Sequence, residues 1–232
     1  MNEGDIYREL TPPDAWRHVV ACCWEQRVGV DRVQRVLPDG HADLLVHEDG
    51  RVEVVGLHDE VDLPFLEAGT WIRGIRLRPH AVAAAFRIDA SLLRNRTLPL
   101  EDVLGSRRAR RLLDARERDA WVTSIEPRPR TERAVRLLSR YPVDLAAVEL
   151  GLTSRQLRRV LVTEVGLAPK VFQRVLRMQR FVTAAELNTG LASAAADAGY
   201  ADQSHMTREI RSLAGLTPTR LLQERRDPLR GA

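Results

Sequence analysis

The chain has 232 residues but no run that approaches about 18 consecutive apolar residues, the length that a membrane-spanning helix needs. Its beginning, MNEGDIYREL, contains no apolar stretch of signal-peptide length either. We therefore expect no membrane segment and a cytoplasmic location. The hydrophobic content of 44% is ample for packed cores, which argues against disorder over most of the chain.

Residues for thiol and metal chemistry are also scarce. The two cysteines, Cys22 and Cys23, are adjacent in a strand-like run, where neighbouring side chains point to opposite faces of a sheet. This placement disfavours a disulfide or a shared metal site, and we expect both thiols to be buried and inert. The histidines of the front half include no His-x-His pair, so nothing indicates a cupin-like metal centre. No catalytic residue, cofactor site or metal site is predicted.

Lysine is nearly absent, since Lys170 is the only one among the 36 basic residues, and the arginines are unevenly distributed. Residues 1–127 carry 18 Arg and Lys against 22 Asp and Glu, a net charge of −4. Residues 128–232 carry 18 against 10, a net charge of +8. A basic segment attached to an acidic one is typical of a nucleic-acid-binding module joined to a part that does not bind nucleic acid.

The front half has the turn-punctuated pattern of a β-rich domain. Between residues 32 and 56, three short apolar runs are separated by Pro38-Asp39-Gly40 and by Asp49-Gly50. Both turns are hairpin signals, so a β-meander or barrel is predicted here. The run 70–79 predicts a further strand that ends at Pro79, followed by flanking helices.

The back half contains no convincing strand and is predicted to be all α-helical. Prolines within residues 127–132 place a boundary there, between a β-rich sensory or oligomerisation domain (1–127, with trailing helices at about 100–126) and an all-α domain (128–232). Thr131 is expected to cap the first helix of this second domain, and Pro142 to end it. Further helices are predicted at about 143–150, 154–164, 170–187, 191–198, 203–213 and 217–226. The fold class is therefore α+β with two domains, the second of about seven helices.

Within the all-α domain, one helix-turn-helix pattern occurs twice. Ala147, Gly151 and Leu157 have its spacing: a small residue permits close helix crossing, glycine adopts the left-handed turn, and an apolar residue anchors the second helix. The second copy, with a turn one residue longer, consists of Ala195, Gly199 and Met206. From there the copies run in step at an offset of 49, pairing Leu157 with Met206, Arg159 with Arg208, Leu161 with Ile210, Gly166 with Gly215 and Pro169 with Pro218. This repetition makes a generic helical bundle a poor alternative.

The helix between the copies explains the repetition. One apolar stripe runs along it, formed by Val171, Val175, Met178, Val182 and Ala185. A helix of about 18 residues spans about 27 Å, comparable with the roughly 34 Å between successive major-groove entries on one face of DNA. Two recognition helices held apart by this rigid spacer can therefore enter consecutive major grooves from a single chain.

At these positions the sequence resembles the AraC/XylS family of transcriptional regulators. The family's second-repeat signature corresponds to Gly199-Tyr200-Ala201-Asp202-Gln203-Ser204-His205-Met206-Thr207-Arg208-Glu209-Ile210, followed by the segment from Gly215 to Pro218. The likeness covers about residues 131–224. The front half, through RVLPDGHADLLV and GIRLRP, is similar to the poorly characterised N-terminal β domain of many actinobacterial-type members. The resemblance implies a sequence-specific regulator of transcription.

The resemblance also implies which residues contact DNA. The family's base-reading positions fall on Arg155, Arg158 and Arg159, with Thr153 as the N-cap of their helix. Arginine can donate two hydrogen bonds to guanine, so a G-containing half-site is expected, with contacts to phosphate or solvent alone as the alternative. The second motif offers a more neutral set with weaker base readout, namely Gln203, Ser204, His205, Thr207 and Arg208. Candidates for phosphate contacts, or for a solvated basic face, are Arg130, Arg174, Arg177 and Arg180.

Double-stranded DNA and, by resemblance, RNA polymerase are the expected partners, whereas a small-molecule effector and a homodimer stay open. By resemblance, an effector in the front domain would act on the DNA-binding domain through the helices at about 100–126. No effector pocket follows from the sequence. Trp24, Trp71, Arg76 and Arg78 could line one, but the tryptophans are expected in a core and the strand arginines at the surface.

Two alternative functions are kept. The first is a non-specific architectural DNA-binding protein, which would show little sequence preference and a steep dependence on salt. The second is a DNA-repair methyl-acceptor enzyme that uses Cys22 or Cys23. That chemistry needs an activated thiolate, and the expected Pro-Cys-His context is missing.

Overall fold

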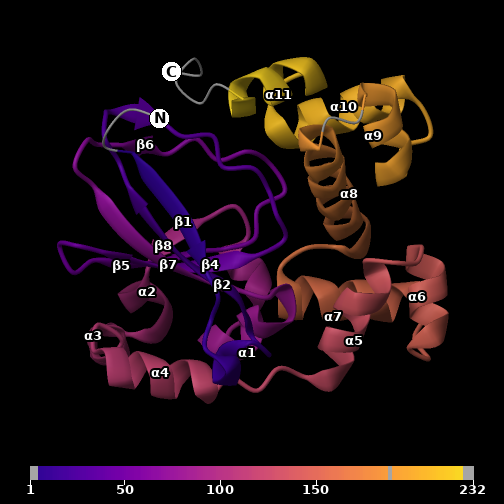
Figure 1. Ribbon diagram of the computed structural model, residues 1–232. Coiled ribbons are helices and arrows are strands. Elements are labelled where there is room, and N and C mark those ends of the chain that lie inside the picture. The colour runs from indigo at the N-terminus through magenta and orange to yellow at the C-terminus, as the bar shows by residue number, and fades with distance from the viewer. Residues whose placement is uncertain (1–4, 188–189, 227–232) are drawn as a thin grey trace.

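The computed structural model describes residues 5–187 and 190–226, with a β-rich front part and a helical back part (Figure 1). The front part is built on one open, antiparallel six-stranded sheet in the order β1-β2-β7-β4-β5-β8. Its strands are β1 (Ile6–Leu10), β2 (Val20–Arg27), β4 (Ala42–His47), β5 (Val52–Val55), β7 (Trp71–Leu77) and β8 (Thr97–Pro99). A separate two-stranded ribbon consists of β3 (Arg32–Val33) and β6 (Phe65–Leu66). The predicted β-rich domain is confirmed, but its sheet does not close into a barrel.

One of the two predicted hairpins is present. Asp49-Gly50 connects β4 to its partner β5, and Gly50 adopts the left-handed φ of +85° that this turn needs. Pro38-Asp39-Gly40 is a turn as well, with Gly40 at φ +81°, but it closes no hairpin, because β3 before it pairs with β6 while β4 after it pairs with β5 and β7. The predicted meander is therefore wrong at this turn. The segment of residues 34–41 crosses from the ribbon to the main sheet instead.

Short helices follow the sheet strands and cover one face of the sheet. β7 ends just before Pro79, as predicted. The helical turns are η1 (Asp14–Trp16), η2 (Pro79–Ala81) and η3 (Ala90–Leu93), and the helices are α1 (Val82–Phe86), α2 (Leu100–Leu104), α3 (Ser106–Arg111) and α4 (Ala115–Thr123). Because strand residues alternate between faces, Val20, Leu44 and Leu77 point together into the core on this side, where Phe86 and Leu93 are also buried.

The predicted seven helices of the back part are present. They are α5 (Pro129–Leu138), α6 (Val143–Glu149), α7 (Ser154–Val165), α8 (Pro169–Glu186), α9 (Leu191–Ala198), α10 (Gln203–Ala214) and α11 (Pro218–Arg226). The predicted cap at Thr131 is wrong. α5 begins earlier, because Pro129 fits the first helical position, where no N–H is needed, and Thr131 is buried inside the first turn. In Figure 1, α8 stands between α5–α7 and α9–α11.

The two parts share one apolar core, which continues from the sheet through α1 and η3 to α7 and α8. The contact is tightest at Gly166, the left-handed residue that ends α7. A Cβ atom there would lie 2.9 Å from the backbone oxygen of Ala90, so only glycine permits this approach. Of the helices within the described ranges, none is both long and apolar enough to cross a bilayer.

Candidate nucleic-acid interface

The first helix-turn-helix unit consists of α6, a tight turn and α7. Gly151 adopts a left-handed φ of +65° in the turn, and Ala147 and Leu157 are buried where the two helices cross. Thr153 caps α7 as predicted, in a reciprocal capping box: its hydroxyl accepts from the Gln156 amide at 3.2 Å, and its own amide donates to the Gln156 side chain at 2.8 Å. The recognition helix therefore starts at a fixed position relative to α6.

The second unit repeats this geometry in α9 and α10. α10 spans Gln203–Ala214 and α7 spans Ser154–Val165, so the two recognition helices have equal lengths and keep the offset of 49 predicted from the sequence. Gly199 takes the left-handed turn at φ +86°, and Asp202 caps α10 by accepting from the His205 amide at 2.7 Å. The interval from the turn glycine to the second helix is one residue longer than in the first unit, from Gly199 to Gln203 against Gly151 to Ser154, as predicted. Counted between helix ends, however, the two turns have the same length of four residues.

The predicted DNA-contacting residues lie on the outer faces of these helices. Arg155, Arg158 and Arg159 are exposed on α7, opposite the buried Leu157 and Leu161, as the helical period requires. Within residues 5–187 and 190–226, none of these three guanidinium groups forms a salt bridge or a side-chain hydrogen bond. An exposed guanidinium without an acidic partner can bind phosphate or guanine without first breaking an ion pair.

The corresponding face of α10 is less uniform. Gln203, Ser204 and Arg208 are exposed, whereas His205 and Thr207 are half-buried. The His205 ring lies edge-on against the Tyr200 ring, with 5.4 Å between the centroids. This packing leaves only part of the imidazole free to reach a base.

Residues 145–224 match a family model described as a helix-turn-helix domain, and the match spans both units and α8. The C-terminal domain is an AraC-type helix-turn-helix domain. Domains of this type bind DNA, so the match supports a DNA-binding regulator of transcription. Residues 8–99 match a domain of unknown function (DUF6597), which assigns no activity to the front part. No curated protein matches the chain.

Among solved structures, the chain is similar to ToxT from Vibrio cholerae. The apo form of a ToxT variant from strain SCE256 is 12% identical, with a TM-score of 0.44, over 96% of this chain and 98% of that chain. ToxT from strain O395 is 10% identical, with a TM-score of 0.43, over 94% and 96%. The unsaturated fatty acid bound wild-type ToxT from strain SCE256 is 10% identical, with a TM-score of 0.41, over 95% of each chain.

The AraC-type domain also contains a buried ion cluster that the sequence did not reveal. Glu209 of α10 is only 6% exposed and accepts two hydrogen bonds from Arg177 of α8, at 2.8 and 2.7 Å. Arg174 adds a third at 3.3 Å, and the Arg177 guanidinium lies 5.2 Å from the centre of the Tyr200 ring. Two of the four arginines considered for phosphate contacts, Arg174 and Arg177, thus hold α10 on α8. The sequence offers one sign of this cluster, namely an acidic residue three positions after Met206, on the apolar side of α10.

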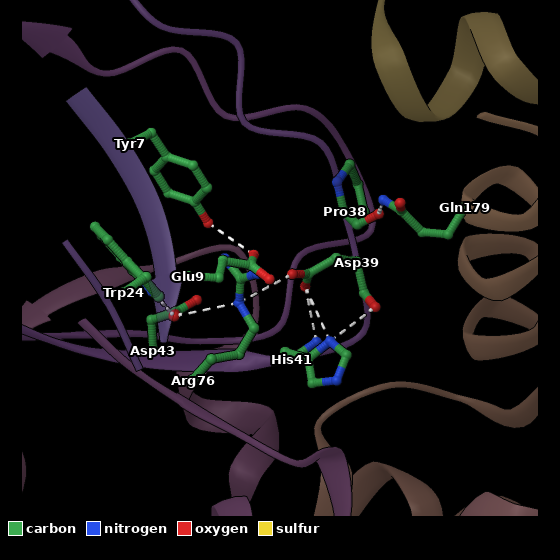
Figure 2. Close-up of polar contacts among 9 residues, drawn as sticks. All are labelled: Tyr7, Glu9, Trp24, Pro38, Asp39, His41, Asp43, Arg76 and Gln179. Atoms are coloured by element: carbon green, nitrogen blue, oxygen red, sulfur yellow. Dashed lines mark hydrogen bonds and ion pairs between the residues drawn. The ribbon is translucent and has the colours of Figure 1, made fainter. Parts of the chain in front are cut away.

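A second polar cluster lies on the face of the front sheet opposite the one that the short helices cover (Figure 2). Arg76 of β7 lies 3.1 Å from Glu9, while its Nε atom lies 3.4 Å from both Asp39 and Asp43. Asp43 also accepts a 2.6 Å hydrogen bond from the Trp24 indole. Burial raises the pKa of Asp43 despite the charge of Arg76. Pairing of β1, β2, β7 and β4 brings these residues together, so no local pattern could indicate the cluster.

The four residues considered for an effector pocket do not line one cavity. Trp24 is buried, as expected, but Trp71 is 37% exposed and packs beside the Arg73 guanidinium rather than in the core. Arg76 was expected to face solvent and instead sits in the acidic cluster with only 22% of its side chain exposed. Arg78 is half-buried and donates to the Arg17 backbone oxygen at 2.9 Å. Across the described residues, no group of three His, Cys, Asp or Glu side chains could hold a metal ion.

The two thiols, which are half-buried rather than fully buried as expected, provide a direct test of the methyl-acceptor alternative. Burial, only partly offset by the charge of Arg76, raises the pKa of Cys22 to about 11, and burial also raises the pKa of Cys23. At pH 7.4 alkylation by iodoacetamide should be slower in the folded protein than in the urea-unfolded chain by on the order of 100-fold, because an ordinary thiol has a pKa of about 8.5. Mass spectrometry of alkylated peptides measures both rates. Equal or faster alkylation of the folded protein would revive the enzymatic alternative.

Proposed function

We propose that this chain is a sequence-specific transcriptional regulator that inserts α7 and α10 into consecutive major grooves of one operator. The observation that carries the proposal is the exact repetition of the recognition helix, 49 residues apart, on either side of the 18-residue helix α8. A helix of this length spans about 27 Å, close to one turn of DNA. We further propose that residues 1–127 form a domain that senses an effector or mediates dimerisation, and that residues 128–232 bind DNA and contact RNA polymerase.

The exposed arginines of α7 favour sequence-specific binding over an architectural role. Arg155, Arg158 and Arg159 lie within five residues at the start of the helix, the part that reaches base edges in helix-turn-helix proteins. Guanine offers two acceptors in the major groove to a single guanidinium. The proposed first half-site therefore contains guanine, and the more neutral α10 reads its half-site more weakly. Because such a regulator acts on the chromosome, we also propose a cytoplasmic location.

Replacing Arg158 or Arg159 with alanine should weaken binding to the selected operator by about 1 to 3 kcal/mol, because a bidentate contact with guanine is lost. Binding to random DNA should change much less. The operator is first obtained by in vitro selection from a random pool, and affinities are then measured by fluorescence anisotropy at one salt concentration. Arg116→Ala, which removes an exposed arginine from α4, is the matched control and should leave both affinities unchanged.

The same measurements separate the proposal from its alternatives. Equal losses on selected and random DNA would assign these arginines to phosphate contacts. Failure to select any preferred sequence, together with equal affinity for all duplexes, would favour the architectural alternative and contradict the proposal.

A further inference from the structure

The segment of residues 34–41, between β3 and β4, makes a polar contact with the far end of the AraC-type domain. Arg35 donates from Nε to the Glu224 carboxylate of α11 at 2.7 Å and from Nη1 to the backbone oxygen of Ala214, the last residue of α10, at 2.9 Å. Both charged side chains are only 19% exposed, so solvent screens this pair less than a surface salt bridge. The contact therefore ties the second helix-turn-helix unit to the front domain.

The same segment also contacts α8. The Gln179 side chain donates to the backbone oxygen of Pro38 at 2.6 Å (Figure 2). At Gly40, an added Cβ atom would lie 3.2 Å from the ring of Phe172, so the backbone packs directly on this buried side chain. Segment 34–41 thus touches three helices of the AraC-type domain, α8, α10 and α11, at separate points.

On its other side, the segment is fixed to the front domain. Val36 and Asp62 exchange two backbone hydrogen bonds at 2.9 and 3.0 Å. Asp39 lies 3.4 Å from Arg76, on the sheet face opposite the short helices, and its side chain accepts from the His41 amide at 2.9 Å (Figure 2). Because the segment contacts both domains, it can fix the position of the AraC-type helices relative to the front domain, whereas a free loop could not.

The two helix-turn-helix units are attached to the front domain differently. The first is packed into the shared apolar core through the end of α7, where Gly166 meets Ala90. The second is joined to the first by α8, and the Glu209 cluster holds α10 on α8. Arg35 comes from the front domain rather than from α8, and it contacts α11 and the C-terminal end of α10. Because this contact is additional to those with α8, it opposes rotation of the second unit about α8.

We propose that Arg35 is a positioning residue for DNA binding: it fixes the rotation of the second recognition helix about α8 and so sets the half-site spacing that the protein accepts. This inference rests on the proposed function. Arg155, Arg158 and Arg208 are exposed while the contact is made, so the contact orients the reading faces without covering them. The front domain therefore takes part in operator selection through a residue that does not touch DNA.

The test uses the full chain and operators in which one base pair is inserted between the half-sites, which turns the second half-site by about 35°. Wild-type protein should lose affinity on insertion. Arg35→Ala should bind the original operator more weakly than wild type does. Its fold-loss of affinity on insertion should be smaller than that of wild type by about fivefold or more, which is the lower end of typical coupling between sites. Arg51→Ala, which removes an arginine paired with Asp49 in the β4–β5 turn, should keep the wild-type loss on insertion.

Two further measurements make the test decisive. Exchanging the charges in an Arg35→Glu, Glu224→Arg double variant should restore part of the spacing preference, which a merely destabilised protein would not regain. Hydrogen exchange at Gly215 and Leu216, which needs no DNA, should be faster in Arg35→Ala than in wild type.

The outcomes are separable. An unchanged loss on insertion in Arg35→Ala, or an equal fold-loss on every duplex including a single half-site, would overturn the inference while leaving the proposed function intact. Wild-type protein that binds all duplexes equally would overturn the proposed function and with it the inference, even if hydrogen exchange confirms the contact.

Discussion

A Glu209→Ala variant is expected to unfold with a free energy about 2 to 4 kcal/mol below that of wild type. The substitution removes the carboxylate that both Arg174 and Arg177 contact. Their two positive charges then remain beside the buried ring of Tyr200 without a negative partner. Removing one partner of a buried pair costs about 3 to 5 kcal/mol, and the partial exposure of both arginines reduces this value. Urea unfolding followed by far-UV circular dichroism measures the change.

Two comparison variants define what the Glu209 measurement means. Glu209→Gln keeps the side-chain volume but has no charge, and an NH2 donor replaces one of the two carboxylate oxygens. Its loss of unfolding free energy should therefore be intermediate. Glu149→Ala removes an exposed carboxylate from the end of α6 and should change the unfolding free energy by less than about 0.5 kcal/mol. If Glu209→Ala matched Glu149→Ala, the ion cluster would contribute nothing to the docking of α10 on α8.

A Gly74→Ala variant should have a free energy of unfolding lower than that of wild type by about 3 kcal/mol or more, the upper end of the usual cost of overpacking a core. Gly74 lies in the middle of β7, opposite Trp24 on β2, and an added Cβ atom would overlap the indole ring. Moving the ring away breaks its hydrogen bond to Asp43 and leaves that carboxylate buried with a poorer set of donors. Thermal unfolding monitored by tryptophan fluorescence checks the expectation.

A double-mutant cycle identifies the cause of the Gly74 effect. In a Trp24→Ala background the space occupied by the ring is empty, so adding Gly74→Ala should cost much less than it does in wild type. Gly190→Ala is a second control, because nothing lies within 4 Å of the new Cβ atom and only a small capping effect is expected. An undiminished cost in the Trp24→Ala background would show that the clash with the ring is not responsible.

The helical domain could be predicted from sequence because its information is local. The spacing of Ala147, Gly151 and Leu157 specifies a turn between two helices within a dozen residues, and α8 shows its apolar stripe in the same direct way. The outer positions of Arg155, Arg158 and Arg159 follow from the same helical period. Their contacts with DNA remain predictions, since exposure alone does not choose between a base and a phosphate.

The front domain was harder to predict because its pairings are distant in sequence. The sequence predicts the turn at Gly40, but β3 pairs with β6, which lies about thirty residues later in the chain. No local signal indicates this pairing. The Arg76 cluster likewise depends on four strands, β1, β2, β7 and β4, lying side by side. Glu209 was overlooked for a related reason: its two partners lie on another helix, more than thirty residues earlier.

The continuous apolar core between sheet and recognition unit bears on how loss-of-regulation mutants should be interpreted. Random mutagenesis would yield inactive alleles throughout both halves of the polypeptide, because a packing defect near Leu44 or Phe86 weakens the support beneath α7. The cellular abundance and the thermal stability of each variant protein would separate packing defects from other defects. Alleles that keep both properties, yet fail at their promoter, identify residues that contact the operator or that position the recognition helices.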